Sequence, residues 1–452
     1  MLTTLALFAF LRLKLIDKGP ATMDPLTDGP ISVTDNPKKG LEENDSLEDT
    51  SDKTSNGESN STPQVTEGHS AVVAAHYNAL EEKGLTERNK SRIVHLRNFN
   101  NWIKSMLINE YMDSIKRNKS VGSPVRVLDM CCGKGGDLLK WRNTGITHLI
   151  CADIAATSVD QCRARYDDMR NRRDNRYSNG FSAEFIVADC TKERLREQYK
   201  DVSLQLDLVS CQFSFHYSFE SLPQAECMLR NASECLRPGG YFIGTMPDAN
   251  DIVTRYRTAG SASFGNSVYQ IEFEKTDEPF PLFGAKYGFT LYEVVNCPEF
   301  LVHFPTFERL ARKYGLELVS KSRFEDYFKQ SKDRGRNLLG KMQALETYPP
   351  NEGETLAGGE DEYKHAKEFI EKNNADRVGT LSQSEWEATS LYMVFAFKKL
   401  KAISMDDTGR PIYETKDQSL NTKEPVEAVK RQNEEEGSSK EHCQKRMKSD
   451  TT

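Results

Sequence analysis

The sequence has no apolar run of the roughly twenty residues that a helix needs to cross a bilayer. Residues 1–11 are apolar but too short, and the nearest positive residues, Arg12 and Lys14, follow them, which is the reverse of a secretory signal. Because Met23 opens a polar stretch of its own, we expect residues 1–22 to precede an alternative start. The sequence therefore predicts no membrane partner.

Metal-site spacing is also missing. The ten cysteines include no CxxC pair, and the eight histidines form no cluster at zinc spacing. Several cysteines, Cys151 and Cys211 among them, fall in apolar segments that are typical of buried strands. These features predict a reduced intracellular protein that holds no metal.

The net charge of -7 is concentrated near one end of the chain. Residues 23–70 carry eleven acidic residues against three lysines, so the remainder is nearly neutral and can present basic patches to a nucleic acid. The same segment has few large apolar residues, which predicts disorder. We expect a disordered acidic leader over residues 1–70, one catalytic domain over residues 71–400 and a disordered polar tail over residues 401–452.

The stretch from residue 125 to residue 141 organises the rest of the chain. An apolar run rich in β-branched residues enters a loop of glycines and small residues, and a pattern with one apolar helical face follows, which predicts strand, tight turn and helix. Apolar segments and helical patterns then alternate. The predicted strands are 147–153, 185–189, 206–213 and 241–246, and the predicted helices are 156–172 and 225–236. Five strands in such alternation predict a parallel, doubly wound α/β sheet.

The remaining segments have other patterns. A helix continues over residues 96–108 with its large apolar side chains on one face, whereas residues 237–240 are expected to form a turn before the fifth strand. We interpret residues 251–299 as an antiparallel insertion that walls a substrate site. Further expectations are a helix over 307–314, strands over 316–320 and 390–397, and a mainly helical, charged stretch with an acidic loop over 329–381.

The strand ends suggest the ligand. Parallel strands direct their carboxyl ends to one crevice, so Asp129, Asp153, Asp189 and Gln212 should converge there. Acids and an amide suit a ribose and an adenine better than phosphate, and no P-loop Lys-Ser/Thr pair follows the glycines. S-adenosylmethionine fits this pattern better than NAD. Asp153 is expected to accept hydrogen bonds from the ribose hydroxyls, and its alternative role is a cap for the next helix.

Several further motifs stand out, at residues 127–129 with 133–141, 97–102, 211–213 with 216–220, 238–245, 298–302 and 384–390. Together they resemble the motifs of the eukaryotic mRNA cap guanine-N7 methyltransferases. The resemblance implies a Rossmann-like, class I S-adenosylmethionine-dependent methyltransferase with a seven-stranded, doubly wound sheet. It also implies methyl transfer from S-adenosylmethionine to N7 of the terminal guanosine of the mRNA 5′ cap, a nuclear location and a small activating subunit.

Site residues follow from the same resemblance. Cofactor contacts are implied at Lys104, Cys131, Asp153, Asp189, Gln212 and Tyr217. Cap and RNA contacts are implied at Asn100, Asn101, Lys134, Lys140, Arg165, His216, Glu299 and Tyr392. Guanine N7 has a lone pair and no proton, so we expect no acid or base catalyst, only positioning by His216, Glu299 and Tyr392.

Alternatives stay open at this point. Glu299 could be a surface acid, His216 a core imidazole, Tyr392 a strand aromatic and Arg165 a solvated helix residue. Cys131 stands where the family has a glycine, and its Cβ either crowds the cofactor or is accommodated by a compatible backbone angle. The chain could also methylate another RNA, or could be an inactive cap-binding scaffold.

Overall fold

The computed structural model describes residues 69–79, 87, 89–171, 180–275, 278–402, 404, 406 and 412. The predicted boundaries at residues 70 and 400 stay predictions, because nearly all of the leader and most of the tail lie outside these residues. Residues 1–22, the expected upstream segment, lie outside them as well. Within the described ranges, no helix combines the length and the apolar character that crossing a membrane requires.

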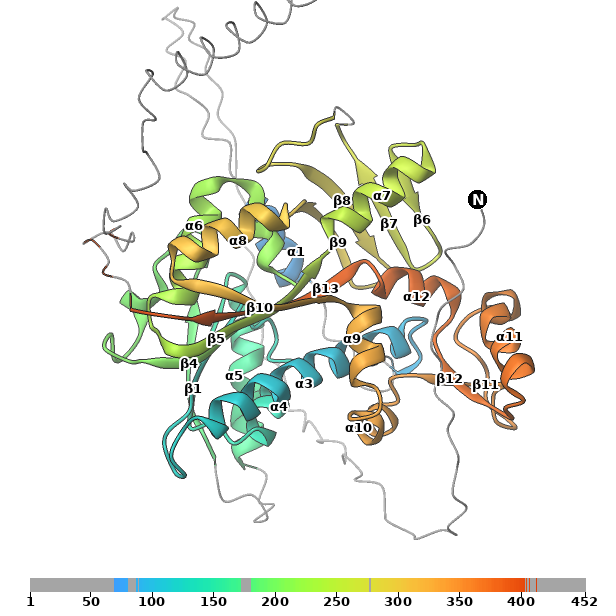
Figure 1. Cartoon of the computed structure of the whole chain (residues 1–452), viewed down its shortest axis with the longest axis horizontal. Coiled ribbons are helices and arrows are strands. Elements are labelled where there is room, and N and C mark those ends of the chain that lie inside the picture. The colour runs from blue at the N-terminus through green and yellow to red at the C-terminus, as the bar shows by residue number, and fades with distance from the viewer. Residues whose placement is uncertain are drawn as a thin grey trace, which may run out of the picture.

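A seven-stranded sheet forms the centre of the fold (Figure 1). Its strands are β1 (Arg126–Met130), β2 (His148–Asp153), β3 (Ser182–Val187), β4 (Leu206–Gln212), β5 (Leu236–Pro247), β10 (Leu316–Arg323) and β13 (Tyr392–Lys399). They lie in the order β10-β13-β5-β4-β1-β2-β3. The first five strands are parallel to one another, as predicted, whereas β13 runs antiparallel to both β5 and β10.

Helices cover both faces of this sheet, which confirms the doubly wound prediction (Figure 1). On one face lie α3 (Val94–Arg117), α4 (Leu138–Asn143) and α5 (Ala156–Asn171), and on the other lie α6 (Leu222–Ser233) and α8 (Phe304–Lys313). Each face has its own apolar core. The predicted apolar face of α3 is buried throughout, at Phe99, Trp102, Ile103, Met106 and Tyr111. Between β3 and β4 only a short 3-10 helix, η1 (Leu195–Gln198), is present.

Two predicted boundaries around β5 were wrong. The turn expected at residues 237–240 lies inside β5, which already pairs with β4 at Leu236 and takes up these residues as a shift in register after Leu206. A Cβ at Gly240 would lie 2.8 Å from the carbonyl oxygen of Asp207, so this close strand contact requires glycine. The helix α6 begins three residues earlier than predicted, because Ser221 caps it.

The insertion after β5 is antiparallel, as predicted. It contains β6 (Ser263–Gly265), β7 (Tyr269–Phe273), β8 (Lys286–Leu291) and β9 (Val295–Phe300), which pair in that order. The first part was predicted wrongly, since a helix, α7 (Ala249–Ala259), precedes the strands. The strand β9 packs against η2 (Phe215–Glu220), the short helix that follows β4. This contact brings the insertion to the carboxyl edge of the main sheet.

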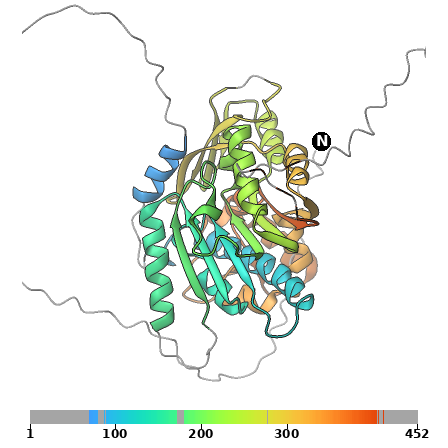
Figure 2. The same ribbon diagram turned by 90° about the vertical axis from the view of Figure 1, so that its left-hand side faces the viewer.

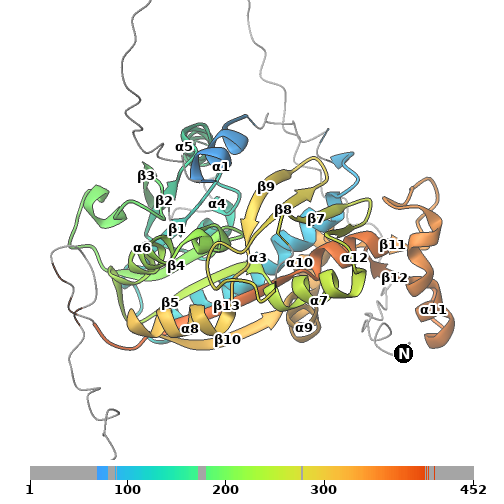
Figure 3. The same cartoon turned by 90° about the horizontal axis from the view of Figure 1, so that it is seen from above.

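Residues beyond β10 form the opposite end of the molecule from β3 (Figure 3). They comprise α9 (Phe324–Ser331), α10 (Arg336–Lys341), β11 (Glu346–Tyr348), η3 (Glu360–Tyr363), α11 (Lys364–Asn373), β12 (Val378–Thr380) and α12 (Gln383–Thr389). The helical prediction for this stretch missed the two-stranded sheet of β11 and β12.

The N-terminal helix α1 (His69–Ala79) lies on the surface at the other end, beside α5 (Figure 2). It also contacts β9. The helix α1 therefore contacts both α5, which covers the main sheet, and β9 of the insertion, although it is distant from both in sequence.

Candidate functional site

The glycine loop after β1 is held tightly against β2. The Cys132 N–H donates to the carbonyl oxygen of Ala152 at 3.0 Å, and the Gly133 N–H donates to Asp153 Oδ2 at 2.8 Å. Gly133 and Gly135 adopt left-handed φ angles of 53° and 75°. The turn thus places the loop backbone at the carboxyl ends of β1 and β2.

A cavity that is open to solvent lies beside this loop. Four of the six residues predicted to contact the cofactor line it: Cys131, Asp153, Asp189 and Tyr217. Of the four residues that topology predicted to converge, Asp153 and Asp189 line this cavity, whereas Asp129 and Gln212 do not. Cys131 and Tyr217 were implied by the family resemblance alone.

Two of the three acids in the cavity wall, Asp153 and Asp189, are fixed by local hydrogen bonds. Asp153 Oδ1 accepts from the Ala155 N–H at 2.9 Å, so the carboxylate does cap the next segment, yet it remains in the cavity wall. Burial raises the pKa of Asp153, and the bonds from Ala155 and Gly133 offset part of this rise. Asp189 Oδ1 accepts from the N–H of Thr191 at 2.9 Å and from its hydroxyl at 2.6 Å. Both side chains are therefore oriented before any ligand binds.

The cavity fits a nucleoside with an apolar extension. Apolar side chains supply most of its remaining wall, including Val73, Ile154 and Phe300. The two carboxylates can accept hydrogen bonds from hydroxyl and amino groups but would repel phosphate. S-adenosylmethionine has a ribose, an adenine and a positive sulfonium and carries no phosphate, so the residues present match it.

The helix α1 forms one side of the cavity, which the sequence reasoning missed. His69, Val73 and Tyr77 line it. They are four residues apart and so share one face of the helix, and that spacing was the available signal. The His69 ring is 2.8 Å from Glu220 Oε1, and the Tyr77 hydroxyl is 3.5 Å from that of Tyr217.

A second group of buried side chains adjoins the cavity through Tyr217. Glu299 on β9 lies opposite Tyr287 on β8, and the Tyr287 hydroxyl donates to Glu299 Oε2 at 2.7 Å. The His216 ring packs against that of Tyr217 with centroids 4.4 Å apart, and its Nε2 lies 3.2 Å from Glu299 Oε1. Neither ring nitrogen of His216 makes a hydrogen bond to any residue the structure describes, although the side chain is fully buried.

Tyrosines surround the Glu299 carboxylate. Burial, and then the negative charge of Glu299, raises the pKa of Tyr287 and of Tyr392 well above the usual value. The pKa of Tyr217 is raised in the same way, with Tyr77 as a further cause. The Tyr392 ring packs edge-on against Phe213 at 5.0 Å. The structure thus brings His216, Glu299 and Tyr392 into one buried region. The hydroxyls of Tyr217, Tyr287 and Tyr392 stay neutral beside the Glu299 carboxylate.

A third group connects α3 with the glycine loop. Asp137 accepts from two ammonium groups, those of Lys104 at 2.9 Å and Lys140 at 2.6 Å. Burial alone would raise the pKa of Asp137, but the two lysines lower it below its usual range. Lys140 also donates to Asn101 Oδ1 at 3.1 Å. Residues predicted separately for cofactor and cap are therefore joined through one carboxylate.

Other predicted residues lie elsewhere. Lys104 and Gln212 do not line the cavity, and Gln212 bonds to Ser210 at 2.9 Å and Thr245 at 3.1 Å behind it. Asn100 accepts from the Thr389 hydroxyl at 2.8 Å. Lys134 lies on the glycine loop, and Arg165 lies on α5, the helix that follows β2. Neither side chain lines the cavity.

The sheet order, with antiparallel β13 between β5 and β10, and a nucleoside cavity at the carboxyl edge define a class I S-adenosylmethionine-dependent methyltransferase. Its cofactor is S-adenosylmethionine. Residues 60–400 match the mRNA (guanine-N(7))-methyltransferase domain, and the chain belongs to this family.

Named relatives cover most of the chain. It is 56% identical over 349 residues to the mRNA cap guanine-N(7) methyltransferase of Drosophila melanogaster, covering 76% of this chain and 81% of that one. The Caenorhabditis elegans enzyme of the same name is 44% identical over 74% of this chain and 88% of its own. The mRNA cap guanine-N(7) methyltransferase 1 of Oryza sativa subsp. japonica is 40% identical, over 72% of this chain and 80% of its own. The predicted family, fold class and cofactor are confirmed.

Cys131 stands where the family has a glycine. Its φ of 61° is left-handed, the conformation that a glycine takes without strain and that costs a residue with a Cβ about 1–2 kcal/mol. We interpret this as a Cβ that is tolerated through the backbone angle rather than one that crowds the cofactor. We expect Cys131→Gly to retain cofactor affinity within a factor of about 3 and Cys131→Val, which is β-branched, to lose at least ~1 kcal/mol of unfolding free energy. Isothermal titration and denaturant unfolding measure both. A Gly variant that bound markedly less cofactor would contradict this interpretation.

Asp129 predicts a pH-dependent stability. Burial and the charge of Asp137 raise its pKa to about 8, although the Trp141 indole donates to it at 3.0 Å. The folded protein thus holds a proton that the unfolded chain loses near pH ~4, so this contribution to stability is lost as pH rises toward 8. The free energy of unfolding of Asp129→Asn should be higher than that of the wild type by at least about 1 kcal/mol at pH 8, and by less at pH 5. Chemical unfolding of the free protein measures both values. If variant and wild type differed in unfolding free energy by the same amount at pH 5 and pH 8, the proton held by Asp129 would not explain the difference.

Proposed function

We propose that the chain transfers a methyl group from S-adenosylmethionine to N7 of the terminal guanosine of the mRNA 5′ cap. The observation that carries the proposal is the contact between Tyr217 and His216. Tyr217 lines the cofactor cavity, and His216 adjoins Glu299, so a base held by this pair would lie next to the methyl donor.

The acid and the imidazole suit a guanine. A carboxylate can accept from both the N1–H and the N2–H of the Watson–Crick edge, and Glu299 is held for this by the Tyr287 hydroxyl. The ring nitrogens of buried His216 make no hydrogen bond to a described residue, although Nε2 lies 3.2 Å from Glu299 Oε1, so the imidazole can bond or stack with the base. Tyr392 adds a neutral aromatic wall.

Positioning is the main task of these residues. The cofactor supplies a methyl group on a positive sulfur, and guanine N7 supplies a lone pair that needs no deprotonation. Holding the two in line can account for about 7–11 kcal/mol of such a barrier. No residue is required as a proton acceptor, and Asp153 and Asp189 in the cavity orient the donor rather than react with it.

Basic residues beside the glycine loop suit the cap phosphates. Lys140 and Lys104 share the single charge of Asp137, so this group retains a net positive charge. Lys134 on the loop and Arg165 on α5 extend the positive charge along the same edge. Asn100 and Asn101, on the facing turn of α3, complete the proposed cap and RNA contacts.

A nuclear location and a small activating subunit that docks on the catalytic domain belong to the same proposal. Both rest on the family resemblance. Fluorescence imaging of the tagged chain and co-purification from nuclear extract test them separately.

The function is tested by methyl transfer from labelled S-adenosylmethionine to RNA ending in GpppG. The expected product after nuclease digestion is 7-methylguanosine, with no transfer to the same RNA ending in a triphosphate. Equal labelling of both RNAs would favour a methyltransferase for another RNA site. A chain that bound capped RNA but transferred no label and bound no cofactor would instead be a scaffold.

A further inference from the structure

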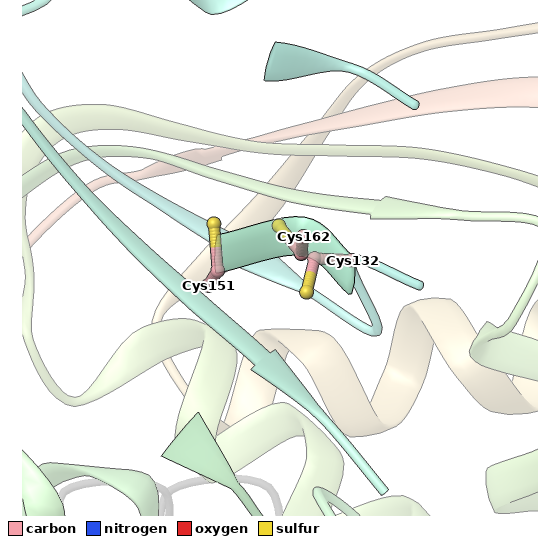
Figure 4. Close-up of side chains that lie close together, drawn as sticks. All are labelled: Cys132, Cys151 and Cys162. Atoms are coloured by element: carbon pink, nitrogen blue, oxygen red, sulfur yellow. The ribbon is translucent and has the colours of Figure 1, made fainter. Parts of the chain in front are cut away.

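Three cysteine thiols meet beneath the glycine loop (Figure 4). Cys132 belongs to the loop, Cys151 to β2 and Cys162 to α5, and their three sulfur atoms all lie within 4.8 Å of one another. Cys151 and Cys162 are buried and Cys132 is half-buried. Their sequence separations match no metal-binding motif, so the sequence alone gave no sign of this group.

The group is close in size to a metal centre. Zinc–thiolate bonds of ~2.3 Å in a tetrahedral or trigonal arrangement place the sulfur atoms about 3.8–4.0 Å apart. The observed distances between the sulfur atoms exceed these values by less than ~1 Å, and rotation of the half-buried Cys132 side chain can close this difference. Among the described residues, this is the one set of three ligand-bearing side chains so arranged. It has no oxygen or imidazole ligand, which favours soft cations.

Two positively charged side chains share α5 with Cys162. They are Arg163 and Arg165, and Arg163 packs over the Phe185 ring at 5.0 Å. Their charge can offset the negative charge that three thiolates would bring to a divalent cation.

We propose that Cys132, Cys151 and Cys162 form a site for one soft, thiophilic divalent cation, such as Zn²⁺ or Cd²⁺. Such a cation joins the loop to both β2 and α5. The loop already bonds to β2 through Cys132 and Gly133, and a Cβ at Gly135 would lie 2.8 Å from the Cys162 sulfur, so the loop and α5 are in direct contact. The site lies behind the loop, and of its three cysteines none lines the cofactor cavity.

A second thiol group provides the matched control. The Cys131 thiol contacts those of Cys190 and Cys211, and Cys190 is buried like Cys151 and Cys162 of the proposed site. Cys190→Ser therefore removes one buried thiol from the neighbourhood without touching the site. Cys162→Ser and Cys132→Ser each remove one proposed ligand, and the half-buried Cys132 can be replaced with little disturbance of the core.

The test is titration of the reduced full-length chain with Cd²⁺, followed by the ultraviolet thiolate-to-metal absorption band and by equilibrium dialysis. We expect one tightly bound Cd²⁺ per chain and a higher thermal midpoint in the wild type and Cys190→Ser. Both effects should be lost in Cys132→Ser and Cys162→Ser. Absence of the band in the wild type, its survival in both ligand variants, or its loss in Cys190→Ser would overturn the proposal. None of these readouts depends on methyl transfer.

Discussion

Glu299→Gln should lower kcat/KM for capped RNA by about 100- to 1,000-fold, or ~3–4 kcal/mol, and leave the affinity for S-adenosylmethionine unchanged. The amide that replaces one carboxylate oxygen presents a donor to the guanine N–H groups, so one charge-assisted bond is lost and a donor faces a donor. The Tyr287 hydroxyl can still donate to the remaining oxygen, so the side chain keeps its place. Initial rates with GpppG-ended RNA, and titration with the cofactor, measure the two quantities.

Glu272→Gln is the matched control for this experiment. Glu272 lies on β7 in the same small sheet, but its side chain is exposed on the other side of the strand from its buried neighbours. Its replacement should leave both rate and affinity at wild-type values. If Glu299→Gln methylated capped RNA at the wild-type rate, Glu299 would not read the guanine edge, and the proposed cap pocket would be wrong.

Asp153→Asn should weaken S-adenosylmethionine binding by at least about 100-fold. Bonds from ribose hydroxyls to a charged acceptor contribute about 1.5–3 kcal/mol each, and the variant also sets an amide against the N–H groups of Gly133 or Ala155. Isothermal titration with S-adenosylhomocysteine measures the loss. Asp160→Asn, an exposed replacement in the first turns of α5, is the matched control and should bind normally.

The ribose contact can be separated from the capping role of Asp153. The wild type should prefer S-adenosylhomocysteine over its 2′-deoxy analogue, whereas Asp153→Asn should distinguish the two poorly. Equal discrimination by both proteins would mean that the carboxylate only orders the loop.

Part of the cofactor side of the site could be predicted from sequence because topology fixes it. Asp153 and Asp189 stand at the carboxyl ends of parallel strands, so placing the strands brought them together, whereas Cys131 and Tyr217 needed the family resemblance. Lys104 and Lys140 show the limit of that reasoning. Both are tied to Asp137, and only the packing of α3 on the glycine loop reveals the shared partner.

Two kinds of element were missed from the sequence. In α7, Ala249, Ile252, Val253 and Tyr256 form an apolar stripe at helical spacing, so this helix could have been predicted, but the stretch was interpreted as part of the antiparallel insertion. The strands β11 and β12 have three residues each, too few to show an alternating pattern. The cysteines of the proposed cation site come from a loop, a strand and a helix, and no spacing rule applies to such a set.

The account depends on the claim that the chain aligns its two substrates and transfers no proton. The most direct test is the single-turnover rate of methyl transfer, with RNA and cofactor saturating, for the wild type and His216→Asn between about pH 6 and pH 9, the range in which an imidazole would titrate. We predict a slower variant whose rate is a constant fraction of the wild-type rate at every pH. A wild-type profile with one ionisation that disappears in His216→Asn would show a general base and contradict the account.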